Sequence, residues 1–494
     1  MTVAVNGGQR SVLRRLPWIT VRLVAMLPGQ ESRLRFPPAV ALVWLVTFAA
    51  ALAIPDGARA QISRAGAWDG PGDVCSADTL LGDWGGVRSQ LANYGIGFGL
   101  QEQTEVWGNL VGGIKRGATY DGLTTADLCI DLDKAMQWPG AKIFTYGFQI
   151  WGPGPTHDYV GSLQLISSIE ATPSTKLYDL WFEQDLFDGK VSFRFGQGGV
   201  DSQGFMAAPY DTVYLNSSFT LPPLIALNLP SGGPGYPLAS PMALLMLNPT
   251  NEISWMSGVF VEDPAPPGTG NPQERDLHGT AFNFNDHTLS INELSYTPAF
   301  LGDLQGTYKL GMWYATGPFP DQLRSTDGLS LANPASNGIP LIHAGDYAFY
   351  AIANQMLWHK PKTEGQGIGV FLQVMHGPED RNINDLWIEA GVNWKGPLPN
   401  RSHDEAGIAL TYAGIGSYAR QYSRDVVYYS GVGSPYAQGE PIIEATYRAR
   451  LTPWFKVQPD LQYVINTGAG IPTLQAPTPL KNALVIGMRA TVNF

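Results

Sequence analysis

The chain ends with the stretch Ala483–Phe494, which reads ALVIGMRATVNF. Every second residue of this stretch is apolar: Leu484, Ile486, Met488, Ala490, Val492 and Phe494. A period of two is typical of a β-strand whose two faces meet different surroundings. A terminal aromatic residue on such a strand resembles the signal that barrel-assembly machinery reads in outer membranes. The stretch therefore predicts the last wall strand of a membrane barrel and that machinery as a partner.

The same alternation recurs through the chain in segments of about ten residues, as membrane strands require. The clearest cases are Ile96–Trp107, Ala126–Asp133, Phe144–Ile150, Tyr308–Tyr314, Leu386–Asn393, Ala406–Tyr412 and Ile443–Tyr447. Glu102 interrupts the apolar face of the first segment. About fifteen segments can be counted, and a closed single-chain barrel has an even number of strands. We therefore predict an all-β fold, a transmembrane antiparallel β-barrel of sixteen strands, with the remaining strand near His278–Phe284.

Composition agrees with a barrel. Charged residues make up 15% of the 494 residues, against about 25% in soluble domains. Mean hydropathy is -0.07, as expected when lipid-facing and water-facing residues alternate. Three stretches rich in Pro, Gly, Ser and Asn predict long extracellular loops: Thr220–Pro249, Glu262–Glu274 and Gly317–Pro340. A soluble sandwich would also alternate, but it would need a polar outer face.

The amino-terminal region is typical of an export signal. Arginines precede an apolar run, Ala39–Ile54, and Ala58-Arg59-Ala60 provides small residues for cleavage. A membrane anchor is the alternative, but the run is shorter than the roughly 20 residues that cross a bilayer. We therefore predict a signal peptide at residues 1–60, a periplasmic segment with a short helix at residues 61–95 and the barrel at residues 96–494. The translation start, Met1 or Met26, is left open.

Charge and cysteine content restrict the partners. The formal net charge is -11, which argues against nucleic acid and against anionic ligands as the main partner. The two cysteines, Cys75 and Cys129, would reach an oxidising compartment, where they could pair and pin the segment to the inner wall. The alternative to this disulfide is that both cysteines remain thiols. The seven histidines are scattered, so we expect no metal and no cofactor.

A hairpin around Asp188-Gly189 contains the first group of candidate pore-lining residues. Asp-Gly between alternating strands indicates a two-residue turn, which would place Glu183 opposite Arg194. Opposite charges across a strand pair attract each other. The residues predicted to point inward are Asp179, Trp181, Glu183 and Arg194. They would either contact a permeating solute or form a structural ion pair.

The carboxy-terminal strands contain the second group. A charge that faces lipid near mid-membrane costs about 2–4 kcal/mol, so the polar residues of these strands should point inward. This group consists of Glu444, Arg448, Asp460, Gln462 and Arg489.

Three parts of the sequence resemble the carbohydrate-selective porin family. They are Leu80–Arg88, which reads LLGDWGGVR; Leu177–Gln184 with Arg194-Phe195-Gly196; and Leu451–Trp454 with Gln458–Val464 and Gly487-Met488-Arg489. The resemblance implies a sixteen-stranded barrel with a polar constriction that glucose and related sugars cross. The nine candidate residues would then bind sugars weakly enough for release.

The resemblance also implies a location and partners. It predicts the outer membrane of a Gram-negative bacterium, passive diffusion of mono- and small oligosaccharides, contact with outer-membrane lipid and lipopolysaccharide, and a monomer or homotrimer. A general diffusion porin without sugar preference is the alternative. An adhesive barrel would leave the inward polar residues without a role. We expect no enzyme, because paired acids such as Asp131 and Asp133 lack a nucleophile–base arrangement.

Overall fold

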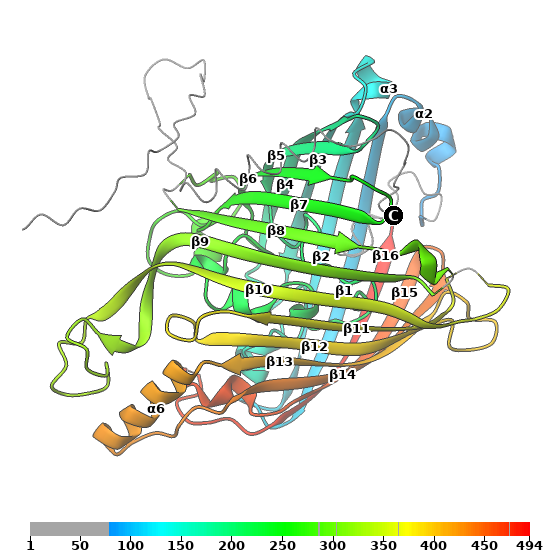
Figure 1. Ribbon diagram of the computed structural model, residues 1–494. Helices are drawn as coiled ribbons and strands as arrows, with labels where there is room; N and C mark the ends of the chain where they lie inside the picture. The colour runs from blue at the N-terminus through cyan, green and yellow to red at the C-terminus, as the bar shows by residue number, and fades with distance from the viewer. Residues whose placement is uncertain (1–78, 285–286, 303, 364, 474) are drawn as a thin grey trace, which may run out of the picture. The chain divides into compact units, whose positions relative to one another are not determined.

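The computed structural model describes residues 79–284, 287–302, 304–363, 365–473 and 475–494. The predicted signal peptide, residues 1–60, and Cys75 lie outside the described residues. Within the described part, sixteen strands form one closed barrel in which each strand pairs with its neighbours in sequence and β1 pairs with β16 (Figure 1). All pairs are antiparallel. The predicted fold class is confirmed.

The strands are β1 (Ile96–Val111), β2 (Gly117–Asp131), β3 (Ala141–Trp151), β4 (Ser174–Leu186), β5 (Val191–Gly198), β6 (Ser240–Leu247), β7 (Ile253–Val261), β8 (Thr288–Tyr296), β9 (Gly306–Ser325), β10 (Pro340–His359), β11 (Gly367–His376), β12 (Asn384–Lys395), β13 (Glu405–Ile415), β14 (Gly439–Thr452), β15 (Phe455–Val464) and β16 (Ala483–Asn493). The helices are α2 (Val87–Asn93), α3 (Leu132–Met136), α4 (Pro223–Ala226), α5 (Pro272–Arg275) and α6 (Ser417–Ser430). Short 3-10 or π turns are η1 (Trp84–Gly86), η2 (Thr156–Val160), η3 (Ser217–Phe219), η4 (Pro230–Gly232), η5 (Ala299–Leu301) and η6 (Thr467–Gly470). Among the described residues, no helix combines the length and the apolar character needed to cross a bilayer.

Alternation along each strand separates an outer from an inner face. On β9, Leu310 is 64% exposed whereas Trp313 is fully buried. The exposed apolar side chains form the outer surface, and the buried ones pack inside the barrel. On β3, however, the aromatic face points inward, where Tyr146, Phe148 and Ile150 belong to a buried cluster. Alternation in the sequence therefore locates a strand but does not say which face meets lipid.

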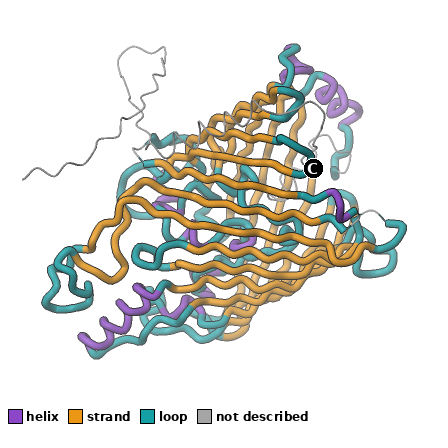
Figure 2. Tube along the Cα trace, viewed as in Figure 1, coloured by secondary structure: helices purple, strands orange, loops and turns teal. Residues whose placement is uncertain are grey.

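The connections between strands differ in length at the two ends of the barrel (Figure 2). One end has short turns such as residues 187–190 and 453–454. It is also the end at which β1 begins and β16 ends. The other end has the long loops 152–173, 199–239 and 416–438. Bacterial barrels keep short turns on the periplasmic side. The long loops are therefore extracellular or folded inward.

Three local expectations are wrong. The stretch His278–Phe284 is not a strand, because its backbone carbonyls accept hydrogen bonds from the tops of β4 and β5: Leu177 N donates to His278 O at 2.9 Å and Gln197 Nε2 to Gly279 O at 2.7 Å. The alternating segment at Ala126–Asp133 ends as a strand at Asp131. The side chain of Asp131 accepts from two backbone N–H groups and caps α3.

The third wrong expectation is the extent of two loops. Thr220–Pro249 contains strand β6. The other stretch, Gly317–Pro340, begins as strand, because β9 continues to Ser325. Proline and glycine are tolerated there because this part of the β9–β10 hairpin pairs on one side only.

The described part of the amino-terminal segment binds the end of the chain beside the seam, the place where β1 and β16 pair and close the barrel. Leu80 N donates to Asn493 O at 2.8 Å, and Arg88 Nη2 donates to Phe494 O at 3.0 Å. The Arg88 guanidinium also lies over the rings of Trp84 and Phe98. The short helix expected before the first strand is present as α2, although the domain boundaries remain predictions.

Candidate functional site

The segment 199–239 lies inside the barrel and crosses the lumen. Its backbone contacts walls that are far apart around the barrel: Met206 N donates to Glu293 Oε2 on β8 at 2.8 Å, and Leu215 N donates to Glu444 Oε1 on β14 at 2.6 Å. The hydroxyl of Tyr214 donates to a backbone carbonyl of β12. We call this segment the constriction loop; the sequence left open which loop folds inward.

A second inserted segment, residues 152–173, covers the wall formed by β1, β14, β15 and β16. Gln164 N donates to Glu440 Oε1 at 3.0 Å, and Gln462 Nε2 donates to Ile166 O at 2.8 Å. Ser218 Oγ of the constriction loop donates to Gln164 Oε1 at 2.9 Å, which joins the two inserted segments.

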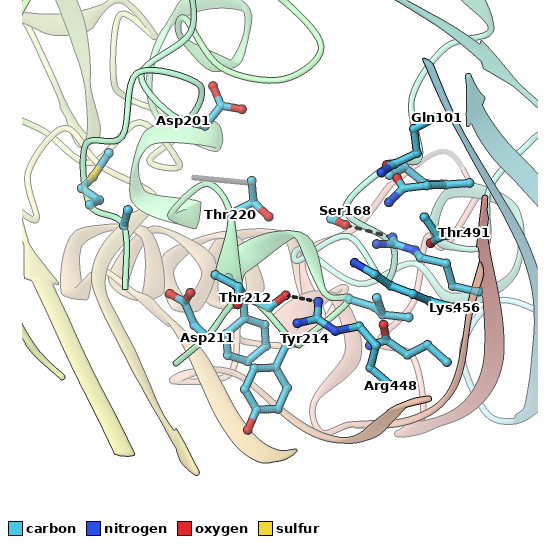
Figure 3. Close-up of a pocket in the computed structure, with 18 of the residues that line it drawn as sticks. Gln101, Ser168, Asp201, Asp211, Thr212, Tyr214, Thr220, Arg448, Lys456 and Thr491 are labelled. Atoms are coloured by element: carbon cyan, nitrogen blue, oxygen red, sulfur yellow. Dashed lines mark hydrogen bonds between the residues drawn. The ribbon is translucent and has the colours of Figure 1, made fainter. Parts of the chain in front are cut away.

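A cavity remains between the inserted segments and this wall (Figure 3). In Figure 3, Arg448, Lys456 and Thr491 stand on the wall side, and Asp211, Thr212 and Tyr214 stand on the side of the constriction loop. The polar lining of the cavity includes Gln101, Gln103, Ser168, Asp201, Asp211, Arg448, Lys456, Gln458, Arg489 and Thr491. The lining offers many hydrogen-bond donors and acceptors to a polar solute.

Two of the nine candidate residues line this cavity and also hold the inserted segments. Arg448 donates to Thr212 O at 3.1 Å and pairs with Glu405 at 3.0 Å. Arg489 donates to Ser168 Oγ at 3.0 Å and pairs with Glu105. Both arginines point inward, as expected from the cost of exposing charge to lipid.

Three other candidates lie behind the constriction loop rather than in the cavity lining. Glu444 accepts from Leu215 N and Asn216 N at 2.6 and 3.1 Å. Gln462 accepts from Asn216 Nδ2 at 3.0 Å and donates to Asp460 Oδ1 at 3.1 Å. These side chains anchor the loop to β14 and β15.

The hairpin candidates form a buried network at the start of the constriction loop. The predicted register is confirmed, because Glu183 pairs with Arg194 and Trp181 with Gly196. Arg194 Nε donates to Glu183 Oε2 at 2.9 Å, and its guanidinium lies 4.0 Å from the Trp181 ring centroid. Arg194 Nη1 also donates to Gln203 Oε1 at 2.6 Å. The network is separate from the residues that line the cavity.

The turn of this hairpin is longer than expected. Strand pairing ends at Leu186 and Val191, so residues 187–190 form the turn. Phe187 and Asp188 have φ values of 54° and 56°. The register survives because the added residues extend both sides of the turn equally.

A β-bulge places Asp179 in the network. Tyr146 pairs with Asp179 while Gly147 pairs with Leu177, so Tyr178 is an extra residue in β4. A bulge redirects side chains, and here both Tyr178 and Asp179 are buried inside. The Tyr178 hydroxyl donates to Asp201 Oδ1 at 2.6 Å. Asp179 Oδ1 accepts from Gln203 Nε2 at 2.9 Å.

Burial raises the pKa of acidic residues in the inserted segments. It raises the pKa of Asp201 despite the hydrogen bond from Tyr178, and it raises the pKa of Asp211 well above its ordinary value. Burial also raises the pKa of Glu170 to about 8, with hydrogen bonds from Thr156 opposing the shift. Burial therefore disfavours the charged form of each of these carboxyl groups.

Several residues of the cavity were missed in the sequence. Lys456 shares a strand face with Gln458 and could have been found by the same alternation. Asp201 and Asp211 lie on the constriction loop, and no periodic pattern marks them. Within the described residues, no group of three or more His, Cys, Asp or Glu is arranged to hold a metal. The Cys75–Cys129 disulfide stays a prediction, because Cys75 lies outside the described residues.

Comparison with known proteins identifies the family. The sequence model of the "Carbohydrate-selective porin, OprB family" matches residues 115–494. The chain belongs to this family. Porin B of Pseudomonas aeruginosa is 24% identical over 435 residues, covering 84% of this chain and 91% of that protein. The putative porin QuiX of Acinetobacter baylyi is 23% identical over 441 residues, covering 84% and 93%.

A solved structure shows the same fold. The high-pH structure of Pseudomonas putida OprB superposes with a TM-score of 0.76 at 21% identity, covering 85% of this chain and 99% of that chain. This carbohydrate-selective porin therefore has the sixteen-stranded barrel that its sequence predicts. Family membership makes the chain a channel protein.

Proposed function

We propose that mono- and small oligosaccharides diffuse passively through the cavity between the constriction loop and the β1/β14/β15/β16 wall. The observation that supports this is the lining, in which side chains of Arg, Lys, Gln, Ser and Thr face one another across the cavity. Such groups replace the water around sugar hydroxyls. Phe205, Tyr214 and Phe219 also line the cavity and offer apolar surface to sugar rings.

The proposed location is the outer membrane of a Gram-negative bacterium, as for the family in general. The exposed apolar wall would contact lipid and lipopolysaccharide. The terminal strand that ends at Phe494 would be read by barrel-assembly machinery. For the nine candidate residues, we propose that Arg448 and Arg489, which line the cavity, contact sugar, whereas the other seven keep the constriction loop in place.

A sugar-inhibition experiment tests the proposal. Glucose and a maltooligosaccharide should reduce the ion current through the reconstituted porin, and an amino acid of similar size should not. Gln103→Ala removes a polar group from the lining. It should raise the half-blocking sugar concentration about 2–5-fold, as expected for one hydrogen bond of 0.5–1 kcal/mol.

Val106→Ala is the matched control, because Val106 lies on the same strand and is exposed on the outer face. It should leave sugar inhibition unchanged. Equal inhibition by sugars and amino acids would instead support the general diffusion porin. No inhibition of the unmodified porin by any sugar would refute the proposed function.

A further inference from the structure

The charged groups that line the cavity come from two different sides. Arg448, Lys456 and Arg489 belong to the wall strands β14, β15 and β16, and Asp201 and Asp211 belong to the constriction loop. Figure 3 shows Arg448 and Lys456 on the wall side, with Asp201 and Asp211 on the side of the loop. A solute in the cavity therefore has three cations on one side and two carboxyl groups on the other.

The strand register places the cations of the wall among neutral hydrogen-bonding groups. Gln103 pairs with Thr491, and Thr491 pairs with Lys456, so an amide, a hydroxyl and an ammonium group form one row across β1, β16 and β15. In the next inward row, Arg489 pairs with Gln458. All five side chains line the cavity. Groups that can bind hydroxyls and groups that can bind an anion thus alternate along one wall.

The carboxylates that pair with the two arginines lie outside the lining. Arg489 donates to Glu105, which is fully buried in the wall. Arg448 pairs with Glu405 on β13 at 3.0 Å. Both glutamates are outside the set of described residues that line the cavity. Because a guanidinium has five N–H donors in a fixed plane, it can hold a carboxylate of the wall and present other donors to a solute.

The two carboxyl groups on the loop side already accept hydrogen bonds from the protein. Asp211 Oδ2 accepts from Gln373 Nε2 of β11 at 2.7 Å. Asp201 Oδ1 accepts from the Tyr178 hydroxyl at 2.6 Å. Asp201 and Asp211 are 5% and 3% exposed, and burial raises the pKa of both. Burial disfavours a charged carboxylate, so the loop side offsets the three cations only in part.

Aromatic rings complete the loop side of the cavity. Tyr214 and Phe219 stack with their ring centroids 4.6 Å apart, and both line the cavity. Their apolar surface suits the C–H face of a sugar ring. The cavity therefore combines ring surface and neutral hydrogen-bonding groups with a cluster of cations.

We propose that the cavity prefers sugar acids, which are sugars with one carboxylate group, over neutral sugars of the same size. The hydroxyls of the solute bind Gln103, Gln458 and Thr491, and its carboxylate binds the cations through charge-assisted hydrogen bonds. The preference rests on the proposed function, because it names the class of sugar that the same site favours. The formal net charge of -11 disfavours an anion at long range, but inside the cavity the cations of the lining are its nearest charges.

Three pyranoses of similar size and different charge test the preference. Near neutral pH, glucuronate is an anion, glucose is neutral and glucosamine is a cation. Each is titrated against the ion current of the reconstituted porin in planar bilayers. The half-blocking concentration of glucuronate should be about fivefold or more below that of glucose, because charge-assisted hydrogen bonds are about twice as strong as neutral ones. Glucosamine should need a higher concentration than glucose.

Salt and three variants locate the cause of the preference. The ratio of the half-blocking concentrations of glucose and glucuronate should fall when KCl is raised from about 0.1 to about 1 M, since the Debye length shortens from about 10 to about 3 Å. Lys456→Gln removes one cation of the lining and should lower this ratio about threefold. Lys190→Gln is the matched control, because it removes the same charge in the turn 187–190, outside the lining, and should leave the ratio unchanged. Gln103→Ala removes a neutral group and should raise both concentrations at a constant ratio.

The outcomes separate this preference from the proposed function. Equal block by the three pyranoses, or strongest block by glucosamine, would overturn the preference and leave the proposed function intact. Equal block by glucuronate and by butyrate, an anion without hydroxyl groups, would also overturn it, because the cavity would then select charge alone. Block by none of the sugars would refute the proposed function itself. An unchanged ratio in folded Lys456→Gln overturns the role of the cations, and so does a ratio in the unmodified porin that is independent of salt, which is decisive if the variant does not fold.

Discussion

Replacing Arg194 by alanine removes the cation that joins the barrel wall to the start of the constriction loop. Arg194 bonds Glu183 on β4 and Gln203 on the loop, and it stacks on Trp181. Glu183 is 3% exposed. Removing one partner of a buried ion pair costs about 3–5 kcal/mol, because the other charge stays buried without its partner. Lys142 Nζ remains 3.3 Å from Glu183, so we expect the lower end, about 3 kcal/mol.

The same change should alter conduction. Gln203 bonds both Arg194 and Asp179, so the loop would lose one of its anchors to the wall. We expect larger current fluctuations of the open channel and weaker inhibition by sugar. Arg194→Lys is the control: it keeps the charge but loses the planar fork, so both effects should be smaller. Stability is measured as the temperature of heat-induced mobility change in detergent, and conduction in planar bilayers.

A folded Arg194→Ala barrel with unchanged thermal stability would contradict the ion-pair argument. Lower stability with unchanged current fluctuations and unchanged sugar inhibition would show that the network supports only the wall. In that case the contacts of the constriction loop with other strands, such as β8, β12, β14 and β15, would be enough to hold it.

Arg88→Ala should destabilise the barrel by about 2 kcal/mol, because it removes a hydrogen bond to the terminal residue and contacts with two aromatic rings; unchanged thermal stability would exclude a role at the seam. The pKa of Glu170 is raised to about 8 from 4.5, so its contribution to stability is complete below about pH 4.5 and is lost as the pH rises through 8. Glu170→Gln should therefore match the unmodified protein near pH 5 and exceed its thermal stability increasingly up to pH 9, and a constant difference would contradict this. Gly487→Ala would place a Cβ 2.2 Å from the buried Trp107 ring and should destabilise by about 1–3 kcal/mol. Gly108→Ala, with 3.7 Å of clearance, should have a much smaller effect on the melting temperature.

The wall of the barrel could be predicted from the sequence because each strand carries its own signal. Alternation in Ala483–Phe494 predicted β16, and the turn at Asp188-Gly189 predicted the register of Glu183 with Arg194. Both depend on neighbours in sequence. The predicted count of sixteen strands is confirmed, but the remaining strand was placed wrongly at His278–Phe284, because this stretch crosses the ends of β4 and β5 instead of entering the wall.

The residues that line the permeation pathway could be predicted less well than the wall, because segments that are distant in the sequence form this pathway. The rule that charges avoid lipid placed Arg448 and Asp460 inside, but it did not say which of them lines the cavity. That choice is made by the constriction loop, which covers Glu444 and leaves Arg448 at the lining. The contacts of the loop depend on pairings across the lumen that no local pattern contains.

The acidic composition of the chain has a structural explanation within the lumen. Several inward carboxylates accept hydrogen bonds from backbone N–H groups of inserted segments, as Glu293 does from Met206 and Glu440 does from Gln164. Such charge-assisted bonds are strong, and they hold irregular backbone against a rigid wall. These carboxylates are thereby occupied as anchors, while Arg448, Lys456 and Arg489 stand at the cavity together with the acidic residues Asp201 and Asp211. The net charge of -11 therefore reflects carboxylates that anchor the loops. The charge selectivity of the pathway depends instead on the side chains that line it.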